Sequence, residues 1–298
     1  MRRLKKKAEV LILLGQSNAV GHGIPMAERD VIREPLTHVF GLSRERNQTL
    51  YPTRLTFSGY LSAGMNLAEE QDDTYSLANC LAAQWEQAAE MDTDLPDLYI
   101  VQIAIGAQGV GPGYMWNPEY PEQLIPGKLG TVTISLFPYT RRILSLLKPT
   151  FAQLGVEYHI LGIHWRGGEN DTVTDRPEVM IPLLRPIYRQ LFDMFRDSLG
   201  ELPKTVLYQV ACGMRNYERT DIENLDDMRV MIPALNEMFA DFARENEAIT
   251  LFHPFSLSLY DPDLPQTWGI FSEVDGVHYT GAANAEIAAG ILAEATVS

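Results

Sequence analysis

Cysteine is scarce in this 298-residue sequence, which contains only Cys80 and Cys212. The two residues are far apart, lack the spacing of metal ligands and lie within apolar stretches, so we expect buried free thiols. The six histidines include no pair at metal-ligand spacing. The sequence therefore predicts neither a disulfide framework nor a metal site.

Basic residues are also few. There are 24 Lys and Arg against 39 Asp and Glu, which gives a net charge of -15. Binding to a nucleic acid or to an anionic membrane needs clustered positive charge, and this balance argues against both. A neutral substrate fits this charge best, and the oligomeric state is left open.

Long apolar runs are missing as well. The basic start over residues 1–7, followed by the apolar residues 10–14, imitates a signal peptide. The apolar run is too short, however, and no small-x-small cleavage site follows it. We interpret it as a buried parallel strand. No other stretch is long enough to span a bilayer, so we expect a cytoplasmic protein without membrane contact.

Short apolar runs alternate with helical patterns along the chain, which predicts crossover units and a parallel sheet covered on both faces. We expect an α/β fold, a flavodoxin-like three-layer sandwich with about five parallel strands. Irregular insertions at about 21–73 and 110–133 follow strand ends and should form pocket walls. The predicted strands are 9–14, 98–105, 156–165, 205–211 and 249–252, and the predicted helices are 76–90, 138–147, 181–198, 228–245 and 281–295.

The first motif that could carry chemistry is Gly15-Gln-Ser-Asn18. Ser17 directly follows a buried strand, and Gly15 allows a sharp turn before it. A helical turn that begins at Ser17 would direct backbone N–H groups at an anion. Ser17 is thus a candidate nucleophile, although it could equally be a helix cap. The motif is not the Gly-x-Ser-x-Gly elbow, because position 19 is Ala19.

The second motif is Asp275-Gly-Val-His278, just before the last predicted helix. An Asp and a His three residues apart can share one turn, where the carboxylate accepts from one imidazole nitrogen and the other points outward. His278 would then be a general base.

Two further strand ends offer donors for a developing oxyanion. One is the side chain of Asn170, and the other is the backbone N–H of Gly106. An Asn in a turn and a glycine that merely ends a strand are the alternatives.

Together these four segments resemble, in order, the sequence blocks of the SGNH hydrolase superfamily, and in particular its sialate O-acetylesterase-like branch, which includes carbohydrate esterase family 6. Gly15–Asn18 match the branch's opening Gly-Gln-Ser-Asn. Gly106–Gln108 align with a Gly-Gly-Thr segment, Trp165–Asp171 with Trp-x-Gln-Gly-Glu-x-Asp, and Asp275–His278 with a final Asp-x-x-His. The resemblance spans residues 9 to about 293 and implies one SGNH hydrolase-like domain over 1–298.

The resemblance also implies roles. Ser17 would be the nucleophile, His278 the base and Asp275 the residue that orients it. The N–H groups of Ser17 and Gly106 would form the oxyanion hole, with Asn170 as a third donor, because Gly167 stands where the branch has Gln. No cofactor is required.

Four residues are candidates for substrate binding: Gln16, Asn18, Trp116 and Glu169. Trp116 could stack on a sugar, or it could be an ordinary packed aromatic. Glu169 could orient the surroundings of Ser17 or the sugar, or it could pair with Arg166. We expect His22 and His164, which lie near the site by sequence, to be structural.

The resemblance thus implies a serine esterase that removes small acyl groups, acetyl above all, from carbohydrate esters, with a small-molecule or oligosaccharide acyl ester as its partner. One alternative is a lipase- or thioesterase-like enzyme of the same superfamily. Another is a non-catalytic carbohydrate-binding protein with the same fold. A nucleotide-binding flavodoxin-like protein is disfavoured, because no phosphate-binding glycine motif follows a strand.

Overall fold

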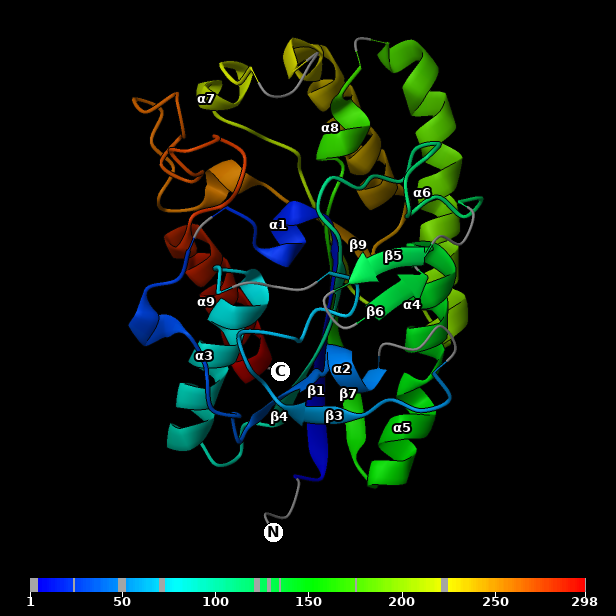
Figure 1. Ribbon diagram of the computed structural model, residues 1–298, viewed down its shortest axis with the longest axis vertical. Coiled ribbons are helices and arrows are strands. Elements are labelled where there is room, and N and C mark those ends of the chain that lie inside the picture. Colours follow the sequence, from blue (N-terminus) through cyan, green and yellow to red (C-terminus); the bar gives the residue numbers. More distant parts are fainter. Residues whose placement is uncertain are drawn as a thin grey trace.

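A computed structural model describes residues 5–23, 25–47, 52–69, 73–120, 124–127, 130–133, 135–174, 176–220 and 225–297. Its centre is a seven-stranded sheet in which β3 pairs antiparallel with β2 and all other neighbours are parallel (Figure 1). In order across the sheet the strands are β3 (Phe57–Gly59), β2 (Val39–Leu42), β4 (Asp97–Ala104), β1 (Lys7–Gly15), β7 (Glu157–Arg166), β8 (Thr205–Tyr208) and β9 (Ile249–Phe252).

Helices cover both faces of this sheet, so the molecule has three layers, as Figure 1 shows. The helices α1 (Ser17–Val20), α3 (Leu77–Met91) and α9 (Gly281–Val297) pack on one face. The helices α4 (Leu136–Ser145), α5 (Leu147–Leu154), α6 (Pro177–Leu199) and α8 (Met228–Glu245) pack on the other. The predicted α/β three-layer fold is confirmed.

The position of strand β1 in the sheet explains why its sequence is apolar from Val10 to Leu14. Its side chains alternate between the two faces, with Val10, Ile12 and Leu14 in one core and Leu11 and Leu13 in the other. A central strand that helices cover on both sides buries the side chains of both its faces, and such strands form continuous apolar runs. The apolar residues 10–14 thus lie in β1, in the middle of the sheet.

The five predicted strands are all present, but the sheet extends further. The segment 21–73, expected to be irregular, contains β2, β3, α2 (Arg44–Asn47) and the 3₁₀ turn η1 (Glu28–Asp30). The segment 110–133 contains the hairpin of β5 (Leu124–Gly127) and β6 (Gly130–Thr133). These strands are only three or four residues long, and several contain Gly or Pro, so they show no clear period. Helix α5 was also not predicted, and strand β8 ends three residues before the predicted boundary at 211.

The remaining short elements lie in the connections. They are α7 (Met214–Tyr217) and the 3₁₀ turns η2 (Glu169–Thr172), η3 (Leu225–Asp227) and η4 (Pro254–Ser256). Within the described part of the chain, no helix combines the length and the apolar character needed to cross a bilayer.

Candidate active site

The turn after β1 carries Ser17, and Gly15 makes that turn possible. Gly15 has a φ of 137°, and a Cβ atom there would lie 2.0 Å from the carbonyl oxygen of Arg166. Only glycine fits so close to a neighbouring strand in this conformation. The N–H of Gln16 then donates to the same carbonyl at 2.9 Å, and Ser17 begins the four-residue helix α1. The backbone thus leaves the sheet and presents Ser17 at the carboxyl end of β1.

Asp275 and His278 form a hydrogen-bonded pair just before α9. Nδ1 of His278 lies 2.6 Å from Oδ2 of Asp275, while Oδ1 accepts from the N–H groups of Val277 and His278. Burial favours the neutral carboxyl, but these hydrogen bonds and the charge of His278 outweigh it and lower the pKa of Asp275 to about 2. An ionised carboxylate only accepts, so Nδ1 carries the proton and Nε2 is the nitrogen able to take one.

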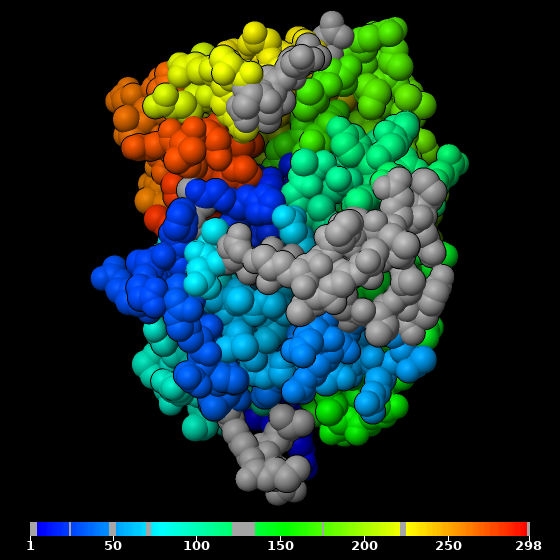
Figure 2. Space-filling model, viewed as in Figure 1, coloured from blue at the N-terminus to red at the C-terminus, as the bar shows by residue number. Residues whose placement is uncertain are grey.

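Ser17 and His278 line the same pocket, whose volume is about 240 Å³. Figure 2 shows the blue surface of the N-terminal segment bordering the orange surface of the segment that precedes α9. Between these two described residues there is no hydrogen bond. Catalytic hydrogen bonds are often long in proteins without substrate. The remaining lining residues are Gln16, His22, Ala107, Glu169, Asn170, Val173, Asn216, Arg219, Leu225, Met228 and Val277.

Asn18 connects the two halves of the site. Its Nδ2 donates to Oε1 of Glu169 at 2.7 Å and to the carbonyl of Val277 at 3.2 Å, and its Oδ1 accepts from the N–H of Tyr279 at 3.1 Å. The last two contacts flank His278 on both sides in sequence. Asn18 is only 4% exposed and does not line the pocket, which contradicts its predicted contact with substrate.

Glu169 lies beneath the nucleophile turn. Its two oxygens accept from Nε2 of Gln16 and Nδ2 of Asn18, each at 2.7 Å, so the residues on both sides of Ser17 are bound to one carboxylate. The alternative pairing with Arg166 is not formed. Nη1 of Arg166 instead donates to Asn284 at 2.7 Å, and its guanidinium lies 4.3 Å from the ring centroid of Tyr279. Gln16 and Glu169 also line the pocket.

The predicted oxyanion donors differ in their surroundings. Among the residues that the structure describes, none accepts a hydrogen bond from the N–H of Ser17. Asn170 lines the pocket. The N–H of Gly106, in contrast, donates to Oε2 of Glu69 at 2.6 Å. The structure therefore argues against Gly106 as an available donor in this arrangement.

Glu69 and His22 form a second carboxylate–imidazole pair that sequence reasoning missed. Oε1 of Glu69 lies 2.9 Å from Nε2 of His22, and the ring of His22 is 6.2 Å from that of His278, centroid to centroid. His22 also packs against Gly106, where a Cβ atom would lie 2.4 Å from its Cε1. Glu69 belongs to no regular pattern and lies 47 residues from His22, so its sequence position gave no indication of this contact.

The prediction that Trp116 stacks on a sugar is wrong. Trp116 is fully buried, its Nε1 donates to the carbonyl of Gly15 at 3.0 Å, and its ring meets that of Trp165 edge to face at 4.9 Å. The bond to Gly15 makes it a support for the nucleophile turn, so the alternative of a packed aromatic holds.

Comparison with known proteins now bears on the fold. No family model matches this sequence, and no curated protein matches it. Among solved structures, the crystal structure of NanS is similar, with a TM-score of 0.56, 13% identity and coverage of 99% of both chains. A protein from Arabidopsis thaliana has a TM-score of 0.55 and 13% identity, with 96% of this chain and 98% of that one covered. The chain shares the overall fold of these two structures over nearly its whole length. At these identities the likeness concerns the fold alone.

Ala107, Gln108 and Gly167 stand where the resembling sequence blocks have other residues, and the structure shows what each of them contacts. Ala107 adopts a φ of 56°, a left-handed conformation that suits glycine, and it lines the pocket. Oε1 of Gln108 accepts from the N–H of Met115. Gly167 packs on Trp165, since a Cβ atom at 167 would lie 3.3 Å from the indole ring.

Two buried polar residues near the site are structural. Asp171 is 2% exposed and accepts from the N–H groups of Val110 and Gly111, which attaches the loop after β4 to η2. Its burial raises its pKa to about 6. His164 bonds to the hydroxyl of Tyr208, and burial lowers its pKa to about 3, as suits a structural histidine.

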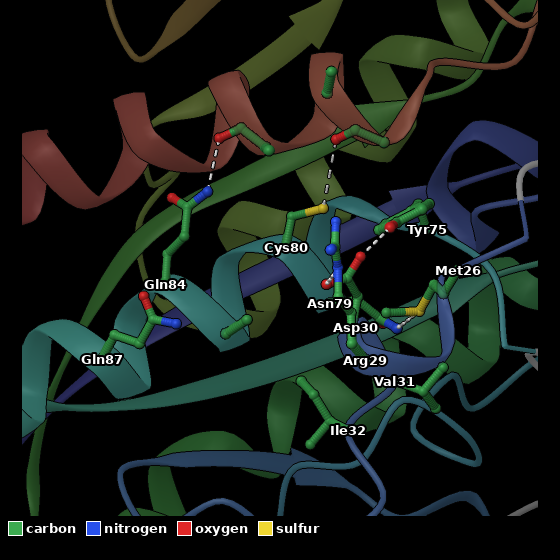
Figure 3. Close-up of a pocket in the computed structure, with 14 residues that line it drawn as sticks. Met26, Arg29, Asp30, Val31, Ile32, Tyr75, Asn79, Cys80, Gln84 and Gln87 are labelled. Atoms are coloured by element: carbon green, nitrogen blue, oxygen red, sulfur yellow. Dashed lines mark hydrogen bonds and ion pairs between the residues drawn. The ribbon is translucent and has the colours of Figure 1, made fainter.

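A second and larger cavity, of about 580 Å³, lies between η1, α3 and the start of α9 (Figure 3). Its polar side chains mainly contact protein groups. The hydroxyl of Tyr75 donates to Asp30, Nδ2 of Asn79 contacts the sulfur of Met26, and Gln84 reaches a carbonyl of α9. None of the predicted site residues lines this cavity, so the candidate site is the smaller pocket.

Proposed function

We propose that this protein is a serine esterase that removes small acyl groups, acetyl above all, from carbohydrate esters. The observation that carries the proposal is the juxtaposition of Ser17 and His278 in one pocket, with Nδ1 of His278 held by Asp275 at 2.6 Å. These residues lie at opposite ends of the chain, and a nucleophile, a base and an orienting carboxylate are the groups that acyl transfer needs.

In the proposed reaction Oγ of Ser17 attacks the acyl carbonyl carbon, and its proton passes to Nε2 of His278. The N–H of Ser17 and the side chain of Asn170 stabilise the oxyanion, with a strong donor contributing about 3–4 kcal/mol. The intermediate collapses with cleavage of the bond to the alcohol oxygen, which takes the proton from His278. Water, deprotonated by His278, then attacks the acyl carbon of the acyl-serine. The bond to Oγ of Ser17 breaks, Oγ takes the proton back from His278, and the carboxylic acid leaves.

The size of the pocket supports a short acyl group. Pockets for drug-sized ligands have volumes of about 300–1,000 Å³, and this one has about 240 Å³. The carbohydrate part of the proposal is supported by the motif resemblance and by the carboxamide and guanidinium groups of Gln16, Asn170, Asn216 and Arg219 in the lining.

Ester hydrolysis by the Ser17→Ala variant tests the proposal. With p-nitrophenyl acetate we expect kcat/KM to fall at least about 1,000-fold. The matched control is Ser62→Ala, because Ser62 is fully buried, accepts from the N–H of Ile32 and does not line the pocket. Its activity should stay within about twofold of the wild-type value.

Substrate panels separate the alternatives. For the wild-type protein we expect activity to fall steeply beyond butyrate and to extend to acetylated xylan or another acetylated sugar. A preference for octanoyl esters would instead indicate a lipase. Binding of an acetylated sugar without turnover would indicate a carbohydrate-binding protein, and full activity in Ser17→Ala would overturn the proposed nucleophile.

A further inference from the structure

The carboxylate of Glu69 accepts a hydrogen bond from a backbone N–H at the edge of the candidate site. Its Oε2 accepts from the N–H of Gly106 at 2.6 Å, and its Oε1 contacts Nε2 of His22 at 2.9 Å. His22 lines the pocket beside Ser17 and His278. The carboxylate therefore binds both the N–H of Gly106, which precedes the lining residue Ala107, and the ring of His22, which lines the pocket.

The carboxylate of Glu69 is ionised at neutral pH. Burial by itself would raise the pKa of Glu69, but the hydrogen bonds from His22 and Gly106 and the charge of Arg44 lower it below its ordinary value. A carboxylate bonded to a backbone N–H forms a charge-assisted hydrogen bond, which is about twice as strong as a neutral one.

The turn that follows α1 places the Glu69–His22 pair against the catalytic candidates. Gly21 ends α1 in a left-handed conformation, and His22 follows with its N–H bonded to the carbonyl of Ser17 at 3.0 Å. At the next residue, Gly23, a Cβ atom would lie 3.1 Å from Nδ1 of His278. The Glu69–His22 pair and the Asp275–His278 pair thus lie against two adjacent residues, His22 and Gly23.

We propose that Glu69 is a built-in competitor for the oxyanion hole: its carboxylate holds the N–H of Gly106, and the substrate must displace it before that donor can act. This inference rests on the proposed esterase function. A developing oxyanion and an ionised carboxylate carry like charge and need the same N–H, so they cannot share it. The Glu69 carboxylate also resembles the carboxylic acid that the reaction releases.

This arrangement predicts that loss of the carboxylate activates the enzyme. In Glu69→Ala the N–H of Gly106 is released, and we expect kcat/KM for p-nitrophenyl acetate to rise about ten- to a hundredfold, which corresponds to one hydrogen bond to a charged group. Glu69→Gln keeps an acceptor for Gly106 without the charge, so its increase should be smaller. Acetate, as product, should inhibit Glu69→Ala at least about tenfold more strongly than it inhibits the wild type.

The matched control is Glu86→Ala. Glu86 is likewise a carboxylate that accepts from backbone N–H groups, those of Thr37 and His38, and its pKa is also lowered, but none of its partners lines the pocket. Its removal should leave kcat/KM within about twofold of the wild-type value, and the melting temperature of each variant identifies any loss of fold.

A slower Glu69→Ala enzyme, or an unchanged one that is still inhibited by acetate as weakly as the wild type, would overturn the inference. If Glu69→Ala does not fold, a folded Glu69→Gln with wild-type activity would also overturn the inference. Failure of the proposed esterase function can be distinguished from failure of this inference. It would appear as retained activity in Ser17→Ala, whatever the activity of the Glu69 variants.

Discussion

Asn18→Ala should damage catalysis more than its distance from the substrate would suggest. The substitution removes three hydrogen bonds, to Glu169, to the carbonyl of Val277 and from the N–H of Tyr279. The last two hold the backbone on each side of His278, and Asn18 is itself the neighbour of Ser17. The variant therefore loosens the hydrogen bonds that join the nucleophile turn to the backbone around His278.

The magnitude follows from the contacts. A net contribution of about 1 kcal/mol for each of three hydrogen bonds gives a destabilisation of about 3 kcal/mol. For a chain of this size that corresponds to a fall in melting temperature of roughly 5–10 °C. Misplacement of a catalytic group by about 1 Å can lower a rate about a hundredfold, so we expect kcat for p-nitrophenyl acetate to fall by about that factor.

Asn47→Ala is the control that separates catalysis from stability. Asn47 is 1% exposed and also makes three backbone hydrogen bonds, to the carbonyls of Ser43 and Thr56 and from the N–H of Thr56. It does not line the pocket, so it should lose similar stability and keep its kcat. The reasoning is refuted if Asn18→Ala keeps kcat within about twofold, or if both variants lose activity equally at a temperature where both are folded.

Two other predictions concern the same site. Because the pKa of Asp275 is lowered from 3.8 to about 2, its ionised form stabilises the fold above about pH 4, and this contribution, about 1–2 kcal/mol after solvent screening, is lost as the pH falls towards 2. Urea unfolding from pH 6 to pH 2 should show this loss in the wild type and not in Asp275→Asn; identical pH dependence would contradict it. Ala107→Gly should raise the free energy of unfolding by up to about 1 kcal/mol, because Ala107 has a φ of 56°. Chemical denaturation checks this, and a clear decrease would show that the left-handed conformation is not strained.

The fold was largely predictable because its central strands are long and apolar. Strands β1, β4 and β7 are covered on both faces, and their sequences reflect this. The placement of Ser17 and His278 in one pocket also agrees with a general rule, since both follow or face the carboxyl ends of parallel strands, where ligands bind in open α/β sheets.

The parts that were not predictable depend on contacts between irregular segments. The role of Trp116 depends on a single bond to the carbonyl of Gly15, 101 residues away. The Glu69–Gly106 bond joins two loop residues that no periodicity relates. The sequence predicts Asn18 as a substrate ligand, but the structure shows that its amide bonds to groups within the protein.

The most direct test of the proposed enzyme is to identify the residue that a fluorophosphonate probe modifies. Such probes form a covalent adduct with an activated serine hydroxyl, and peptide mass spectrometry locates it. We predict a single adduct, on Ser17, formed much more slowly in His278→Ala and abolished by prior reaction with an unlabelled fluorophosphonate. Absence of an adduct in the folded wild-type protein, or an adduct on another serine with Ser17 unmodified, would contradict the account.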